Sequence, residues 1–198
     1  MIYKCLFTLF VLKVRFQVHT VGPRLIYDDK GTGARYDFSC YAPITGSTHQ
    51  YVIGHFGIGA SRNGRKPTPY VMSVIGDKPE NIFKRPTHYQ QIWKDSGSGG
   101  QKEGSFWTVV CPNGFASLSD LCQLGYGTPQ SGAVWCINKR YLENDYHDKW
   151  IWDDRWSGAY DDVDIMGGRT RLTKELVSAT NRRGQKKTLK RIKNTFIE

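Results

Sequence analysis

Apolar and polar residues alternate near the start of the chain. Leu12, Val14, Phe16 and Val18 alternate with Lys13, Arg15, Gln17 and His19. A period of two places successive side chains on opposite faces of a strand, so this pattern predicts a half-buried β-strand. The preceding residues 5–12 are mostly apolar, as in a secretory leader, but no small-residue cleavage site follows them. We therefore expect a strand here and no cleaved leader.

Three segments of the chain share one pattern. Each has an aromatic residue, Asp two positions later, then Ser or Thr followed by Gly, and a return to apolar residues. The segments are residues 27–38, 93–107 and 152–165, and they start 66 and 59 residues apart. Asp and Ser or Thr side chains bond turn amides, and Gly permits positive φ, so each segment is predicted as a β-hairpin.

A second repeated element lies between the hairpins. Residues 54–58 leading to residues 71–74 parallel residues 114–118 leading to residues 134–137, each as strand, Gly- and Pro-rich loop, strand. Three hairpin-rich units of similar length can close against one another about a central axis. The sequence therefore predicts an all-β, β-prism-like fold of three antiparallel sheets with pseudo-threefold symmetry.

Composition agrees with short strands and tight turns. The chain has 198 residues, of which 39% are hydrophobic and 13% aromatic, with 21 Gly and 8 Pro. This balance argues against a helix bundle, a coiled coil and a disordered chain, and the length suits one domain. No apolar run approaches the ~20 residues that a membrane-spanning helix needs.

Positive charge is concentrated at the C-terminal end. The formal charge is +10, yet residues 169–198 hold ten basic and two acidic residues, whereas residues 1–168 hold 18 basic and 16 acidic ones. We therefore predict one domain over residues 1–168 and a basic extension over residues 169–198. A nucleic-acid-binding fold would place its basic stripe on the body, so the distribution argues against a nucleic-acid partner.

The extension has a helical pattern of its own. Leu189, Ile192 and Phe196 are three and four positions apart with basic residues between them, which predicts a short basic amphipathic helix or, failing that, a frayed tail. Such a helix can lie on an acidic membrane surface. The predicted membrane-binding residues are Lys186, Lys187, Lys190, Arg191 and Lys193.

The five cysteines do not fit a metal-binding motif. No Cys-x-x-Cys pair and no His at zinc-like spacing accompanies Cys5, Cys40, Cys111, Cys122 and Cys136. We expect reduced, buried thiols. If the chain is exported, a bridge such as Cys111 to Cys136 becomes possible, and the sequence leaves the pairing open.

One region resembles a known family. The run WKDSGSGGQKEGSFW at residues 93–107, followed by residues 111–118, Pro129 and residues 134–137, is similar to vacuolar protein sorting-associated protein 62. Phe115 stands where that family usually has Tyr, and Ser119 where it often has Gly. The resemblance implies a β-prism-like body and a role in protein sorting toward a vacuole or lysosome, with no established reaction. It implies a cytoplasmic, vacuole- or endosome-associated protein, with secretion as the alternative.

Motifs for catalysis are missing from the sequence. The five histidines are scattered, and we find no Gly-x-Ser-x-Gly elbow in a strand-to-helix context and no phosphate-binding loop. We expect no enzyme activity and no cofactor. Residues 153–164 hold five aspartates, a composition that hard cations such as calcium favour, but we prefer the interpretation that these carboxylates cap the hairpin. The metal question stays open.

The hairpin loops are the predicted ligand-binding site. Trp93 and Trp107 at strand ends are expected in the core, whereas Trp156 lies within a loop and is expected to be exposed. We predict a non-catalytic module of vacuolar or endosomal sorting that binds an acidic membrane surface or a glycan. The alternatives are a secreted lectin or toxin-targeting module and a tail-mediated nucleic-acid binder. The predicted ligand-binding residues are Asp28, Asp29, Asp95, Asp153, Asp154 and Trp156.

Overall fold

Short β-strands make up the protein. The computed structural model describes residues 13–59, 66–181 and 188–197. Across these ranges, sixteen strands form six antiparallel sheets, and the helical elements are single turns: α1 (Pro79–Ile82), η1 (Lys139–Tyr141) and η2 (Asn194–Phe196). No helix in this part of the chain is long and apolar enough to cross a bilayer. The predicted all-β fold is confirmed.

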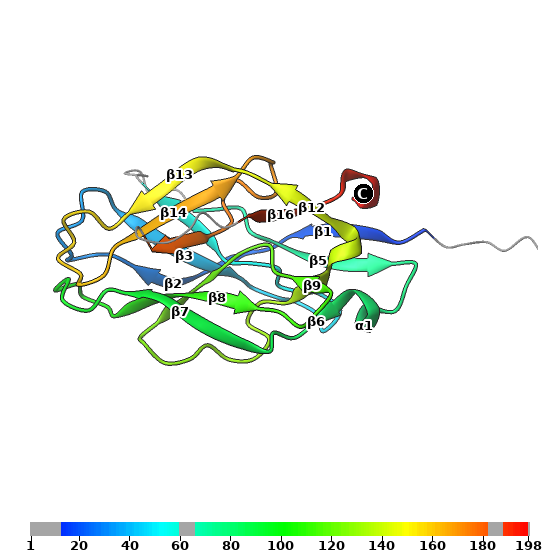
Figure 1. The fold of residues 1–198 in the computed structure, drawn as a ribbon, viewed down its shortest axis with the longest axis horizontal. Helices are drawn as coiled ribbons and strands as arrows, with labels where there is room; N and C mark the ends of the chain where they lie inside the picture. The colour runs from blue at the N-terminus through cyan, green and yellow to red at the C-terminus, as the bar shows by residue number, and fades with distance from the viewer. Residues whose placement is uncertain (1–12, 60–65, 182–187, 198) are drawn as a thin grey trace, which may run out of the picture.

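Three of the sheets are built on the predicted hairpins. In each, the second strand of the hairpin is central and a third strand pairs with its free edge. The strands are β2 (Pro23–Asp28), β3 (Phe38–Pro43) and β4 (Phe56–Gly59); β7 (His88–Lys94), β8 (Gly104–Val110) and β10 (Leu121–Leu124); and β13 (His147–Asp153), β14 (Val163–Gly168) and β15 (Ser178–Asn181). The three hairpin loops lie together at the left end of the molecule in Figure 1.

The other three sheets are smaller and join strands that come before and after each hairpin. They pair β1 (Arg15–Thr20) with β5 (Tyr70–Ile75), β11 (Cys136–Asn138) with β6 (Phe83–Lys84) and β9 (Phe115–Ala116), and β12 (Leu142–Asp145) with β16 (Leu189–Ile192). The same order of pairing therefore occurs three times along the chain. Each unit forms two sheets, not the single sheet that the sequence predicts, because its outer strands pair with each other and not with the hairpin. A threefold rotation relating the units stays a prediction.

The alternating N-terminal segment is the strand that its pattern predicts. β1 pairs with β5 in the register Phe16 to Val74, and Phe16 is fully buried, while Val14 and Val18 pack against the same core. Residues 5–12, which resemble a leader, lie outside the described residues.

Aromatic side chains fill the space between the hairpin sheets. Tyr27, Trp93 and Trp152, one from the first strand of each hairpin, are buried together with Phe38 and Phe106. Gly104 makes room for this packing, because a Cβ there would overlap the Tyr27 ring. A second core lies between the outer sheets and contains Phe16, Phe56, Phe83 and Ile192 among others. These cores hold the hairpins, and therefore the loops, in fixed positions.

The predicted C-terminal helix is wrong. Residues 189–192 form strand β16, which pairs with β12, and residues 194–196 form one 3-10 turn. Leu189 and Ile192, the apolar positions of the expected helix, are buried, and Phe196 packs edge-on against Tyr141 at 5.2 Å. The strand is favoured over the helix because its backbone groups pair with the free edge of β12, whereas a short helix on its own is only marginally stable. The core therefore continues beyond residue 168.

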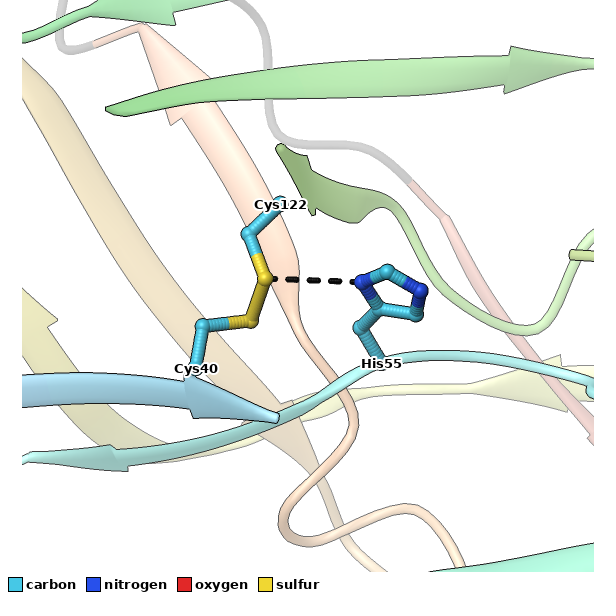
Figure 2. A group of neighbouring side chains, drawn as sticks. All are labelled: Cys40, His55 and Cys122. Carbon is cyan, nitrogen blue, oxygen red and sulfur yellow. Dashed lines mark hydrogen bonds between the residues drawn. A yellow bond between two sulfur atoms is a disulfide. The ribbon is translucent and has the colours of Figure 1, made fainter. Parts of the chain in front are cut away.

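The expectation of reduced thiols is also wrong. Cys40 and Cys122 form one disulfide and Cys111 and Cys136 a second. The second pair is the bridge that the sequence offers for an exported chain. The first joins β3 to β10 across 82 residues of sequence, and His55 lies beside it (Figure 2). Cys5 lies outside the described residues.

Candidate functional site

The three hairpin loops repeat one set of hydrogen bonds. In each loop the backbone carbonyl of one Asp accepts a hydrogen bond from the amide of the Ser or Thr three residues later. The hydroxyl of that Ser or Thr accepts a second hydrogen bond, from the amide two residues after it. The Asp-to-hydroxyl-residue pairs are Asp29 and Thr32, Asp95 and Ser98, and Asp154 and Ser157. The sequence predicts these turns correctly, because short polar side chains stabilise them.

Each loop is also bonded to the next one in a closed ring. The Gln101 amide of the second loop donates to the Lys30 carbonyl of the first at 2.8 Å. The two equivalent bonds run from Tyr160 to Ser96 at 3.0 Å and from Arg35 to Arg155 at 3.2 Å. The loops, which are far apart in sequence, therefore form one surface.

Side chains at the strand ends join the same three repeats in a second ring, in which the hydrogen bonds are donated in the opposite direction. The Tyr27 hydroxyl donates to Asp95 at 3.1 Å, the Trp93 indole to Asp154 at 2.9 Å, and the Trp152 indole to the carbonyl of Tyr36 at 2.7 Å. Trp93 and Trp107 are buried, as expected. Beneath the ring, the aromatic side chains therefore support the fold and are not available to a ligand.

The five aspartates predicted to bind ligand are buried and bonded to the protein itself. Their partners are Lys102 for Asp28, the Phe38 amide for Asp29, Tyr27 and Tyr126 for Asp95, Arg155 for Asp153, and Trp93 with the Val163 amide for Asp154. Burial raises the pKa of Asp29 to about 6, against the opposing effect of the Phe38 amide. In this arrangement the carboxylates fix the loops.

Trp156 is the predicted ligand-binding residue that the structure places on the surface. Its side chain is 72% exposed, and its backbone φ is 70°. A non-glycine residue rarely adopts positive φ, since the Cβ then crowds the backbone. The two other loops have Gly31 and Gly97 at the equivalent position, both also with positive φ. The third loop thus holds a large aromatic side chain where its counterparts have none.

A series of cation–π and ring contacts links Trp156 to three further residues. The Arg35 guanidinium lies 5.5 Å from the Trp156 ring and 5.1 Å from the Tyr36 ring. Tyr36 in turn packs edge-on against Trp150, whose indole donates to Asp153 at 3.1 Å. We call Arg35, Tyr36, Trp150 and Trp156 the aromatic patch. It combines flat apolar faces with a charged donor at the tip of two interlocked loops.

Sequence reasoning missed three of these four residues. Arg35 and Tyr36 belong to the first repeat, whereas Trp150 lies in β13, the strand that leads into the third repeat. Only the contact between the first and third loops brings Arg35 and Tyr36 close to Trp156. A signal for Trp156 itself was present in the sequence. When the three repeats are aligned without gaps, Trp156 falls on the glycine position of the other two.

Three of the predicted membrane-binding residues lie in the described part of the chain, and each contacts the protein itself. Lys190 bonds to Asn144, Arg191 pairs with Glu143 at 3.0 Å, and Lys193 bonds to the carbonyl of Arg140 at 2.9 Å. Lys186 and Lys187 lie outside the described residues. The part of this cluster that the structure shows is an edge of the β12–β16 sheet.

One group of potential metal ligands is present in the described ranges. Cys40, His55 and Cys122 have ligand atoms within 4.8 Å of one another, and the two cysteines are joined as a disulfide. The aspartates of residues 153–164 do not form such a group there. The calcium alternative therefore gains no support from the loop geometry.

Comparisons with known proteins agree with this fold. The crystal structure of GNIP1Aa from Chromobacterium piscinae matches with a TM-score of 0.76 at 19% identity. The match covers 92% of this chain and 38% of that one, so the chain spans less than half of that protein. At this identity the match shows a shared fold alone. No curated protein matches. The family model described as vacuolar protein sorting-associated protein 62 matches residues 12–178, and the chain therefore belongs to that family.

Proposed function

We propose that this chain is a non-catalytic recognition module that binds a glycan through the aromatic patch. The observation behind this proposal is Trp156, which is held exposed on a backbone conformation that favours glycine. Unfavourable backbone conformations occur preferentially at functional sites, where the surrounding structure imposes them. Here the ring of loops supplies that constraint.

The chemistry of the aromatic patch suits a sugar. The apolar face of a sugar ring stacks on an indole, and Trp156 offers such a face to solvent. The guanidinium of Arg35 is a rigid set of donors that can bond hydroxyl or carboxylate oxygens beside the ring. The interlocked loops hold these groups in place before binding, which reduces the entropy lost on association.

Two disulfides support a location in an oxidising compartment. Disulfides persist in secreted and lumenal proteins and are rare in the cytosol. We therefore favour the secreted or lumenal alternative over the cytoplasmic one. Recognition of glycosylated cargo there would agree with the sorting role that the family name implies, and we propose it for this chain on that ground.

A glycan array tests the proposal. The intact chain is expected to bind a defined subset of glycans, and Trp156→Gly to lose at least about tenfold in affinity for them, because the stacking face is removed. Trp156→Gly also restores the residue type of the other two loops, so its fold should be preserved. Tyr146→Ala is the matched control, since Tyr146 is 68% exposed but lies at the opposite end of β13.

A membrane is the rival ligand, and vesicle sedimentation separates the two. Trp and Tyr beside Arg also suit the interface of an acidic bilayer. Binding to anionic vesicles that Trp156→Gly abolishes, with no glycan bound, would replace the glycan by lipid. Unchanged glycan binding in Trp156→Gly would refute the assignment of the aromatic patch.

A further inference from the structure

The neighbourhood of one disulfide has the composition of a metal site. Cys40 lies on β3, Cys122 on β10, and His55 directly before β4. Nδ1 of His55 lies 3.4 Å from Sγ of Cys122, and the three potential ligand atoms lie within 4.8 Å of one another (Figure 2). In a tetrahedral zinc site, Zn–S bonds of about 2.3 Å keep neighbouring ligand atoms roughly 3.5–4 Å apart. The separation of His55 Nδ1 from Sγ of Cys122 is of that order, whereas the two sulfur atoms are bonded to each other and must move apart before they can hold an ion.

The backbone holds His55 in place independently of the disulfide. Its amide donates to the Ser119 hydroxyl at 3.3 Å, and its carbonyl accepts from the Val177 amide at 2.9 Å. These bonds reach two other segments of the chain. His55 would therefore keep its orientation toward the two sulfur atoms when the bond between them opens.

The three side chains are shielded from solvent. Cys40, His55 and Cys122 are all buried. Burial disfavours two thiolates without a partner and therefore favours their neutralisation by a divalent cation.

A cavity adjoins one side of this group. His55 lines a cavity of about 460 Å³ together with Arg24, Gln123 and Gln130, whereas neither cysteine lines it. A water molecule that completes a tetrahedral Cys₂His set, as in zinc sites with an open position, would therefore enter from the side of His55. The Cα atoms of Cys40 and Cys122 are 6.5 Å apart, near the upper end of the range for disulfides, which leaves the thiols room to separate.

We propose that, after reduction of the Cys40–Cys122 disulfide, Cys40, His55 and Cys122 bind one zinc-type ion. The reductant is a dithiol: its two thiol hydrogens pass to Cys40 and Cys122 as it is oxidised to its own disulfide. Binding of the divalent ion then releases two protons, one from each cysteine. The same three side chains are thus a covalent cross-link under oxidising conditions and a metal site under reducing ones. This inference does not depend on glycan binding by the loops.

Cobalt titration of the reduced chain tests the proposal. The protein carries Cys5→Ser, so that the fifth cysteine supplies no ligand, and is reduced under argon with a phosphine that is then removed. We expect one Co²⁺ per chain with thiolate charge-transfer and tetrahedral ligand-field bands, and release of that Co²⁺ by Zn²⁺. The oxidised chain should show neither band.

Matched variants assign the ligands. His55→Ala should weaken Co²⁺ binding at least about tenfold, and Cys40→Ser with Cys122→Ser should abolish it. Cys111→Ser with Cys136→Ser should still bind Co²⁺, since among the described residues these two cysteines are not part of a group of three potential metal ligands. The proposal is overturned if the reduced chain binds no Co²⁺, if Co²⁺ binding survives Cys40→Ser with Cys122→Ser, or if His55→Ala leaves the affinity for Co²⁺ unchanged. Should a cysteine variant fail to fold, the titration of the reduced chain and of His55→Ala still decides.

Discussion

At the residue scale, one position distinguishes the third hairpin loop from the other two. Gly31, Gly97 and Trp156 share a positive φ, but glycine adopts it without steric cost. For Trp156 the left-handed conformation costs roughly 1–2 kcal/mol. The hydrogen-bonded neighbours of the loop hold this conformation.

Two substitutions of Trp156 separate the backbone cost from the loss of the side chain. Both Trp156→Gly and Trp156→Ala remove the indole and its contact with Arg35, but only alanine keeps the unfavourable Cβ. We expect the glycine variant to have the higher free energy of unfolding, by about 1 kcal/mol. Urea denaturation of the two variants measures the difference. Equal stabilities would show that φ at this residue is not a source of strain.

The aspartates show how far residue patterns in the sequence could go. Their repeat correctly predicts hairpin turns, since an Asp followed by Ser or Thr bonds nearby amides. Their burial could not be foreseen, because the partners that cover Asp95 and Asp154 are Tyr27 and Trp93 from other repeats. The spacing of residues within one repeat does not indicate which residues of another repeat will contact its loop.

Asp29 is expected to make stability depend on pH. Its pKa is raised from 3.8 to about 6 in the folded protein, chiefly by burial, so the folded state holds a proton that the unfolded state releases. The contribution of Asp29 to stability is therefore full below about pH 4 and is lost as the pH rises through about 6. Relative to Asp29→Asn, the intact chain should become less stable over that interval. Denaturation at pH 4, 5 and 6 measures this, and a constant difference between the two proteins would contradict it.

At the scale of elements, β16 shows why periodicity alone misleads. Leu189 and Ile192 are three positions apart, a spacing that one face of a helix explains and that a strand buried at both of its ends also permits. Between these two residues, Lys190 pairs with Asn144 of β12 and Arg191 with Glu143. Cross-strand pairs of opposite charge stabilise a sheet. Asn144, the partner of Lys190, is 46 residues away, so the residues around Lys190 give no sign of it. The alternation of apolar and polar residues in β1 lies within the strand itself and was sufficient to predict it.

Two substitutions in β16 distinguish a core strand from a free basic segment. Ile192→Ala should lower the free energy of unfolding by about 2–4 kcal/mol, because it opens a cavity in the core. Lys190→Ala should change it by less than about 0.5 kcal/mol, since its bond to Asn144 is exposed. Denaturation of both variants provides the measurement. A silent Ile192→Ala would be the result expected of a detached tail.

At the scale of the whole molecule, the disulfides link parts that no hairpin joins. Cys40–Cys122 ties the first hairpin sheet to the second across 82 residues, and Cys111–Cys136 closes a shorter span of 25. The fold class and the three hairpins could be predicted because they depend on local patterns. The sequence offers Cys111–Cys136 as one possible bridge but does not fix the pairing, since pairing requires Cα atoms within about 7 Å, and only the assembled sheets set that distance.

Loop length predicts which disulfide contributes more to stability. In the chain-entropy model, closing 82 residues contributes about 4.5 kcal/mol and closing 25 residues about 3.5 kcal/mol. Under oxidising, metal-free conditions, Cys40→Ser with Cys122→Ser should therefore lower the free energy of unfolding by more than Cys111→Ser with Cys136→Ser does. Guanidinium denaturation gives both values. The reverse order would show that contacts around the sulfur atoms outweigh chain entropy.

The ring of hydrogen bonds between the loops has a consequence for how such a protein changes its target. Gly31 and Gly97 lie close to the residues that close the ring, because a Cβ at either would be 3.0 Å from Gln101 or from Tyr160, whereas Trp156 projects into solvent. We therefore expect position 156 to be the variable tip: replacing this residue should redirect recognition while the other two loops keep the ring intact. A new preference could then arise from a single codon.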